Sequence, residues 1–250
     1  MKYDWKDAGE EWSEPWGTSA VQWSGAILPR IRDCLPAATI LEIGSGFGRW
    51  THYLRDHGKM IWAVDRVEEC VDACRERFRG DDRVKCCLND GRSLSMLPDA
   101  SIDFAFSFDS LVHAKREAVE SYVRELGTKL NIGGKAFIHH SNLGAYADSP
   151  RERLPKIIKT LLRKTKILDW EHHRRPDMSA DLFRVLCAQH GLHCYRQELI
   201  NWRGRRLIDC FSYVARSDSK AETTIVRNPN FMREARRLRR TTLSAAPSSD

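Results

Sequence analysis

A loop with three glycines is the strongest chemical signal in the sequence. Gly44, Gly46 and Gly48 alternate with other residues directly after a short apolar run, and Glu42 lies two residues before the first of them. Glycine has no side chain, so such a loop at the carboxyl end of a strand lets a ligand approach the bare backbone. The G-x-G-x-G spacing is shorter than the G-x-G-x-x-G spacing of dinucleotide-binding loops. Alone, the loop is weak evidence, and its meaning depends on the acids that follow.

Three acids follow the next three apolar runs at the points where those runs end. Asp65 comes 21 residues after Gly44, Asp90 follows the third run, and Asp109 follows the fourth. An acid at the position of Asp65 can accept hydrogen bonds from both hydroxyls of a ribose. An acid at the position of Asp90 can accept one from an adenine amino group. Each acid alone would equally suit a helix cap or a turn. Because the carboxyl ends of parallel strands meet at one edge of a sheet, the ordered set predicts a shared ligand crevice.

Histidines near the fourth and fifth apolar runs are candidates for a general base. Asp109 and His113 are four residues apart and would share one face if a helix begins there. His139 and His140 end the fifth run, and neighbouring strand residues point to opposite sides, so we expect one to face the site. Histidine suits proton transfer near neutral pH, although a histidine at a strand end is often a hydrogen-bonded structural residue. These four residues are the predicted catalytic set.

Metal and disulfide chemistry are not predicted. The histidines are accompanied by no carboxylate cluster that would complete a metal site. The eight cysteines include no Cys-x-x-Cys pair, and no secretory signal precedes them, so we expect all eight to be reduced. No stretch approaches the roughly 18–20 uncharged apolar residues of a membrane span. We therefore expect a cytoplasmic protein without a membrane span.

The elements that position these residues alternate between apolar runs and amphipathic stretches. Runs of this kind are typical of strands in a parallel sheet, with the intervening helices on both faces. A helix over 180–190 and a hairpin follow the fifth run and add an antiparallel pair at the end of the sheet. The predicted fold class is α/β: a Rossmann-like, mainly parallel sheet with an antiparallel last strand. The predicted strands are 39–43, 60–64, 83–88, 102–107, 135–140, 194–201 and 207–214.

Charge and composition divide the chain into three parts. We predict an N-terminal helical lid segment over 1–36, one domain over 37–215, and a basic, partly disordered tail over 216–250. The net charge is +7, and the tail and an insert over 142–178 each carry a net charge of +4. This distribution is compatible with a nucleic-acid partner, but a solvated surface has the same appearance.

With these motifs in place, the sequence resembles the class I S-adenosylmethionine-dependent methyltransferases. The resemblance covers 38–141 and 180–215: ILEIGSGFG is similar to the first motif, AVDRVEECVDAC to the second, and NDGRSLSMLPDASIDFAFSFDSLVH to the third and fourth. It implies the methyltransferase form of the Rossmann-like fold, a transferase of the EC 2.1.1 class, S-adenosylmethionine as cofactor and S-adenosylhomocysteine as product. Asp65 would take the ribose hydroxyls and Asp90 the adenine amino group. The cofactor-binding residues that it implies are Glu42, Gly44, Ser45, Gly46, Asp65, Arg66, Asn89, Asp90, Gly91, Phe108 and Asp109.

The predicted function is O-methylation of a sugar or polysaccharide hydroxyl, with a histidine as the general base. E-W-S-E-P-W-G near the start and H-H-S-N after the fifth strand resemble segments of bacterial methyltransferases linked to glycan modification. In the resembling family, additions after the fifth strand cover the acceptor. Some sugar O-methyltransferases use magnesium, which is not predicted here. The residues predicted for acceptor binding are Trp16, Trp23, Tyr146, Trp170, His172, His173 and Arg174.

Other functions stay open at this stage. The acceptor could be an amine or a phenol in place of an oligosaccharide. Methylation of RNA or protein is less favoured, because Phe108-Asp109-Ser110-Leu111 stands where resembling base-amino methyltransferases carry an Asn/Asp-Pro-Pro-Tyr/Phe tetrapeptide. Nucleic acid is therefore not an expected partner. The third alternative is a cofactor-binding subunit without activity of its own, and the oligomeric state is not predicted.

Overall fold

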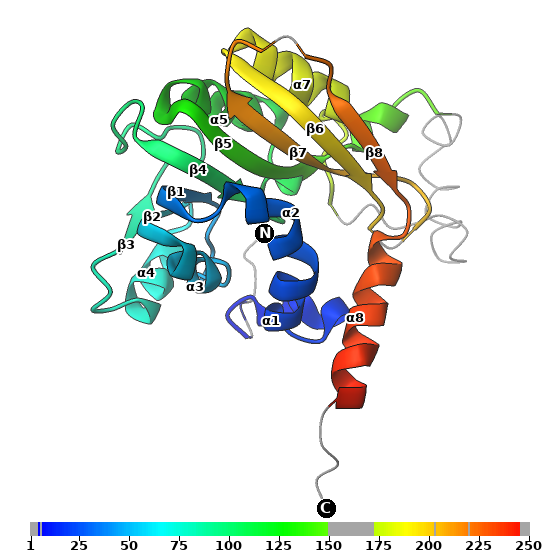
Figure 1. The fold of residues 1–250 in the computed structure, drawn as a ribbon, viewed down its shortest axis with the longest axis horizontal. Coiled ribbons are helices and arrows are strands. Elements are labelled where there is room, and N and C mark those ends of the chain that lie inside the picture. Colours follow the sequence, from blue (N-terminus) through cyan, green and yellow to red (C-terminus); the bar gives the residue numbers. More distant parts are fainter. Residues whose placement is uncertain (1–4, 6, 150–172, 203, 220, 246–250) are drawn as a thin grey trace, which may run out of the picture.

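One eight-stranded sheet forms the centre of the molecule (Figure 1). The computed structural model describes residues 5, 7–149, 173–202, 204–219 and 221–245. The strand order is β3-β2-β1-β4-β5-β7-β6-β8. The strands are β1 (Ala37–Ile43), β2 (Gly58–Asp65), β3 (Val84–Leu88), β4 (Ile102–Ser107), β5 (Leu130–Ser141), β6 (Leu192–Ile200), β7 (Asp209–Arg216) and β8 (Thr224–Asn228).

The sheet confirms the predicted fold class and refines its last part. β7 runs antiparallel to both of its neighbours, β5 and β6, and every other neighbouring pair of these strands is parallel. The antiparallel strand does not lie at the edge, because β7 inserts between β5 and β6 while β8 pairs with the outer side of β6.

The strand order reverses between β1 and β4. From β1 the chain moves outward through β2 to β3, then crosses to β4 on the other side of β1 and moves outward again. Open α/β sheets bind ligands at the carboxyl ends of strands where the order reverses in this way. Gly44 directly follows β1 and Asp109 closely follows β4, so the topology brings both residues to the switch point.

Helices cover both faces of the sheet (Figure 1). α5 (Arg116–Lys129) and α7 (Ala180–Gln189) pack on one face, where Val119 and Phe183 share an apolar core with Ile138 of β5. The hydroxyl of Ser179 caps α7 by accepting from the Leu182 N–H. The other α-helices are α1 (Ser19–Gln22), α2 (Leu28–Ile31), α3 (Thr51–Leu54), α4 (Glu68–Arg77) and α8 (Phe231–Ala245), and 3₁₀ turns lie at Glu10–Trp16, Arg32–Cys34, Arg55–His57, Leu111–His113 and Leu143–Tyr146.

A π-helical turn interrupts the N-terminal segment that the sequence predicts as one helix. α1 continues through this turn (Trp23–Ile27) into α2. In a regular α-helix the ring of Pro29 would clash with the carbonyl four residues earlier, and the wider π turn relieves that clash. Three apolar residues at a spacing of four are nevertheless buried against the sheet: Trp23, Ile27 and Ile31.

The segment predicted as a basic, partly disordered tail contains a strand and a helix. β8 pairs with β6 in parallel, with Thr224 opposite Arg196. α8 then lies beside the N-terminal helices, and Arg239 forms an ion pair with Glu14 at 3.0 Å (Figure 1). The prediction missed both elements because five arginines hide the apolar positions of the helix. These positions recur at helical spacing and are Phe231, Met232, Ala235 and Leu238.

The cysteines and the helix lengths fit two of the sequence expectations. All eight cysteines are free thiols, and Cys74 Sγ lies 3.2 Å from Cys86 Sγ. In the part of the chain that the structure describes, no helix combines the length and the apolar character needed to cross a membrane.

Truncation of Phe231 tests whether α8 belongs to the folded domain. Its ring is 1% exposed and contacts the rings of Trp16, Trp202 and Phe211. We expect Phe231→Ala to lower the free energy of unfolding, measured in urea, by about 3–5 kcal/mol. Arg240→Ala changes an exposed residue of the same helix and should alter the value by less than about 0.5 kcal/mol. Equal stability of the two variants would mean that α8 does not pack on the domain.

Candidate active site

The glycine loop after β1 requires glycine at two positions. Gly44 has φ of 78° and Gly46 has φ of 55°, conformations that favour glycine. A side chain at Gly44 would overlap the hydroxyl of Ser110, and one at Gly46 would meet the Trp5 ring at 2.9 Å. The loop therefore lies directly against the segment that follows β4 and against the N-terminal segment.

The Asp65 carboxylate connects the end of β2 to this loop. Its Oδ2 accepts from the Gly46 N–H at 2.9 Å, and its Oδ1 accepts from the Val67 N–H at 3.0 Å. A carboxylate has about four acceptor positions, so both oxygens retain capacity for ribose hydroxyls. The Arg66 side chain continues toward the next loop, where a Cβ at Gly91 would lie 3.3 Å from its Cδ.

The two polar residues after β3 have different roles. Asn89 shapes the turn: its amide donates to the Tyr122 hydroxyl at 2.9 Å, and its Oδ1 accepts from the Gly91 N–H. Asp90 is exposed, and its Oδ1 accepts from the backbone N–H groups of Ser93 and Arg92, which hold the pKa of the carboxyl below its usual range. The ionised Asp90 side chain is thus oriented at the edge of the sheet, while Asn89 is structural.

Glu42 supports the loop from within the sheet. The side chain is 1% exposed, and its Oε2 accepts from the Thr51 hydroxyl. Burial raises the pKa of Glu42 to about 8, because the charged form loses its hydration. Near neutral pH the Glu42 carboxyl is therefore mostly protonated, so it does not neutralise nearby positive charges.

Polar groups beside the glycine loop leave room for a ligand. Ser45 Oγ and Trp50 Nε1 are buried and lack a hydrogen-bond partner among the residues that the structure describes. Buried polar atoms are normally satisfied, so this pair indicates a polar ligand at the loop. Trp5 covers the loop from outside, with its ring stacked on Phe47 at a centroid distance of 4.5 Å. The sequence analysis did not single out Trp5, which lies on the glycine loop.

A buried cluster of charged residues lies beyond the ends of β4 and β5. Arg174 pairs with Asp209 of β7 through Nε–Oδ1 (3.0 Å) and Nη2–Oδ2 (2.9 Å), and its Nη2 lies 3.2 Å from Asp109 Oδ1. The Asp109 N–H donates to His139 Nδ1 at 3.1 Å, and His139 Nε2 lies 3.3 Å from Asp209 Oδ2. We call Asp109, His139, Arg174 and Asp209 the Arg174 cluster. Its charges hold the pKa of Asp209 well below the ordinary value despite complete burial.

The structure separates the predicted catalytic residues. His140 is fully buried, stacks on Phe183, and has Nε2 2.8 Å from the Ser212 hydroxyl, and burial lowers its pKa to about 4. His139 is also fully buried, within the Arg174 cluster. His113 is exposed, with Nδ1 3.2 Å from the His173 carbonyl. It does not share a helix face with Asp109, because a short 3₁₀ turn replaces the expected helix and Asp109 has φ of 58°.

Most of the predicted acceptor residues are not free to bind an acceptor. Trp16 is fully buried, Trp23 stacks on Tyr53, and the Tyr146 hydroxyl accepts from the Leu207 N–H. Phe108, predicted to close the cofactor site, is 5% exposed and packs in the core. Exposed His173 stays available, Arg174 forms the cluster above, and Trp170 and His172 lie outside the described residues. No group of metal-ligating side chains occurs within the described ranges.

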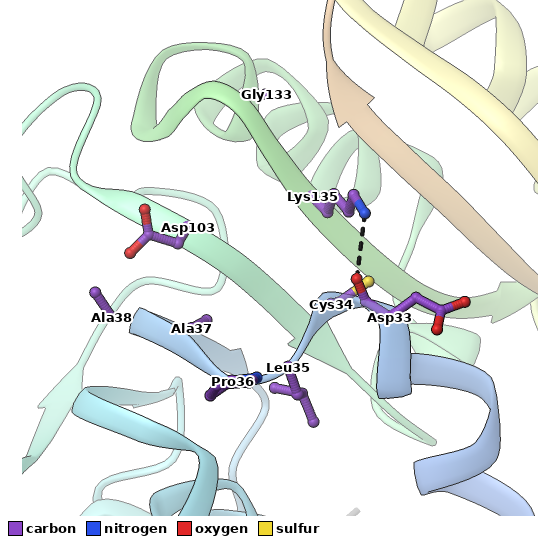
Figure 2. A pocket seen from close by; sticks show the side chains of 9 residues that line it. All are labelled: Asp33, Cys34, Leu35, Pro36, Ala37, Ala38, Asp103, Gly133 and Lys135. Atoms are coloured by element: carbon purple, nitrogen blue, oxygen red, sulfur yellow. Dashed lines mark hydrogen bonds between the residues drawn. The ribbon is translucent and has the colours of Figure 1, made fainter.

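A pocket of about 360 Å³ opens at the opposite edge of the sheet (Figure 2). It lies at the amino ends of β1, β4 and β5, away from the glycine loop. Its polar groups have protein partners: Lys135 Nζ donates to the Asp33 carbonyl, and the Asp103 carboxylate accepts from the Thr39 N–H and the Asn131 amide. We therefore place the functional site at the carboxyl edge.

Sequence comparison matches the central part of the chain to a domain family. Residues 40–134 match the family described as "Methyltransferase domain". Phosphoethanolamine N-methyltransferase 3 of Arabidopsis thaliana is 27% identical over 161 residues, which cover 64% of this chain and 29% of that protein. A phosphoethanolamine N-methyltransferase 1 of Triticum aestivum is 26% identical over 176 residues, 68% of this chain and 31% of that protein. The chain thus spans about three tenths of the length of these relatives.

Solved structures share the fold. An S-adenosylmethionine-dependent methyltransferase from Mesorhizobium loti superimposes with a TM-score of 0.55 and 18% identity, covering 78% of this chain and 98% of the other. Magnesium protoporphyrin IX methyltransferase from Synechocystis PCC 6803, which contains S-adenosylhomocysteine, gives 0.53 and 14%, with coverage of 87% and 90%.

The domain match, the fold and the site agree. Residues 40–134 are similar to methyltransferase domains, and the chain has the fold of S-adenosylmethionine-dependent methyltransferases. The residues present fit S-adenosylmethionine: Asp65 can accept from a ribose, Asp90 from an amino group, and the unpartnered Ser45 hydroxyl faces the same loop.

Substitution of Asp65 tests the nucleoside site. Asp65→Ala removes the acceptor for two hydroxyls and the anchor of the Gly46 N–H, so we expect at least about 100-fold weaker S-adenosylhomocysteine binding by isothermal titration calorimetry. Asp72→Ala, at an exposed position of α4, is the matched control and should leave the affinity unchanged. Tight binding of NADH by the unaltered chain, with no S-adenosylhomocysteine binding, would contradict the assignment.

The raised pKa of Glu42 predicts a pH-dependent stability. The folded chain keeps this proton up to about pH 8, whereas the unfolded chain releases it above the ordinary value of 4.5. The contribution of Glu42 to stability is therefore most favourable below pH 4.5 and falls as the pH rises toward 8. Relative to Glu42→Gln, we expect a loss of up to about 1.4 kcal/mol per pH unit in that window, measured by urea unfolding. A constant difference between the two proteins from pH 5 to 8 would mean that Glu42 is ionised in the fold.

Proposed function

We propose that the chain transfers a methyl group from S-adenosylmethionine to a hydroxyl group of a sugar or glycan, with His113 as the general base. One observation carries the proposal: His113 is an exposed imidazole on the segment after β4, and its Nδ1, not its Nε2, lies 3.2 Å from the His173 carbonyl. A hydroxyl is a poor nucleophile while protonated, so a nearby base accelerates its attack.

The other candidates are less suitable as bases. Both ring nitrogens of His139 face protein groups, and the residue is fully buried. His140 packs under α7. The Asp109 carboxylate is already engaged in an ion pair with Arg174 at 3.2 Å. His113 has its pKa held below the ordinary value by partial desolvation and by the Arg174 cation, so the imidazole is neutral near pH 7 and can accept a proton.

The remaining residues of the site bind and orient the reactants. When bound, S-adenosylmethionine supplies an electrophilic methyl group, and transfer is a displacement at that carbon for which positioning provides much of the catalysis. Asp65 and Asp90 would hold the nucleoside, and the glycine loop would carry the rest of the donor. The Arg174 cluster fixes the segment that bears His173 beside His113, and so shapes the acceptor side.

Methylation of an amine is the second candidate, favoured by the curated relatives, which are named for phosphoethanolamine N-methylation. An amine needs only to arrive uncharged and does not require a base. A screen of sugars, oligosaccharides, phenols, amines, RNA and protein with labelled S-adenosylmethionine separates the candidates. Labelled sugar supports the proposal, whereas label only in amines, in RNA or in protein, or in no acceptor at all, would refute it.

Removal of His113 tests the base. We expect His113→Ala to lower kcat by about 10²- to 10⁴-fold while S-adenosylhomocysteine affinity is unchanged, because a base acts in the transition state and not in donor binding. The kcat of the unaltered chain should rise with pH through a midpoint below 6.5, and the variant should lose that dependence. His190→Ala, at the end of α7, serves as the control. Near-normal turnover of His113→Ala would show that the proton leaves by another route.

A further inference from the structure

Two thiols away from the candidate active site are in contact with each other. The Sγ atoms of Cys74 in α4 and Cys86 in β3 are 3.2 Å apart, although the residues are 12 positions apart in the sequence. The contact belongs to a small apolar cluster formed by Ala63, Cys74 and Phe78, against which Cys86 packs. The proposed methyl transfer uses neither sulfur, so this pair of nucleophilic groups requires an explanation of its own.

The two cysteines differ in access and in acidity. Cys74 is fully buried, whereas Cys86 is half-buried on β3, the strand at one end of the sheet. Hydrogen bonding with Cys74 lowers the pKa of Cys86, and the same contact together with burial raises the pKa of Cys74. The thiolate, not the thiol, is the nucleophilic form of cysteine. Cys86 is therefore the sulfur that a small reagent from solution reaches in a reactive form, and Cys74 lies directly behind it.

We infer that Cys74 and Cys86 form a site of reversible oxidation, at which hydrogen peroxide converts the two thiols to a disulfide. A disulfide bond is about 2.05 Å long, so the sulfurs need to approach by only about 1 Å. An accessible thiolate beside a second cysteine is the usual arrangement of redox-sensitive thiols. The bond would join α4, which begins three residues after Asp65, to β3, which ends two residues before Asp90.

The oxidation proceeds in two balanced steps. The Cys86 thiolate attacks one oxygen of hydrogen peroxide, the O–O bond breaks and hydroxide leaves, so the sulfur becomes a sulfenic acid. The Cys74 sulfur then attacks the Cys86 sulfur, the S–S bond forms, the S–O bond breaks, and hydroxide leaves with the Cys74 proton as water. Two thiols and one hydrogen peroxide thus give one disulfide and two waters. A dithiol reverses the reaction by thiol–disulfide exchange.

Peptide mapping of the unaltered chain tests the inference. The reduced chain is treated with hydrogen peroxide, its remaining thiols are blocked with N-ethylmaleimide under denaturing conditions, and the digest is analysed by mass spectrometry. We expect a peptide pair linked through Cys74 and Cys86, alkylation of six of the eight cysteines, and recovery of all eight thiols after dithiothreitol. A Cys74–Cys86 pair that stays reduced, whether or not other cysteines are oxidised, or a disulfide that excludes either residue, would overturn the inference.

Variants then separate the roles of the two sulfurs. Cys74→Ser removes the second thiol, so oxidised Cys86 should persist as a sulfenic acid, which dimedone labels in this variant and not in the unaltered chain. Cys87→Ser is the matched control: Cys87 is the next residue of β3, packs on the other face of the sheet and should leave the disulfide unchanged. Absence of label on Cys86 in Cys74→Ser, or loss of the disulfide in Cys87→Ser, would contradict the assignment. The peptide map of the unaltered chain decides the inference even if a variant does not fold.

Discussion

The reversal of strand order between β1 and β4 is the constraint on which the site depends. Because these strands are neighbours and parallel, the residues that follow them meet at one edge. The glycine loop after β1 therefore packs against the segment after β4, so closely that Gly44 leaves no space for a Cβ beside Ser110. Donor and acceptor sides are adjacent because the backbone crosses over at this point, and the side chains then define the chemistry.

The buried charged residues at this edge of the sheet differ in their partners. Arg174 links β7 to the segment after β4 through two aspartates, which makes the acceptor side a fixed surface. Arg49 after the glycine loop is comparably buried and donates to the Ser13 hydroxyl, and Glu42 below the loop is mostly protonated.

Local patterns made the sheet and the strand-end positions of Asp65 and Asp90 predictable, and tertiary contacts limited the rest. Asp65 and Asp90 follow apolar runs at the expected spacing, which depends only on nearby residues. The alternation of side chains along a strand predicted that His139 and His140 face opposite sides of the sheet. The surroundings of each imidazole, however, depend on packing against α7 and β7. Asp209 pairs with Arg174, which is 35 residues earlier in the sequence. The local pattern shows only an acid at the start of an apolar strand. Five arginines in α8 concealed its apolar face.

A crystal structure of the chain with S-adenosylhomocysteine is the most direct test of the central claim, that the β1–β4 switch point is the methyl-donor site. The account predicts the ribose hydroxyls within about 3 Å of the Asp65 carboxylate and the adenine amino group beside Asp90. A ligand bound at the amino edge of the sheet, beside Lys135, would contradict the account.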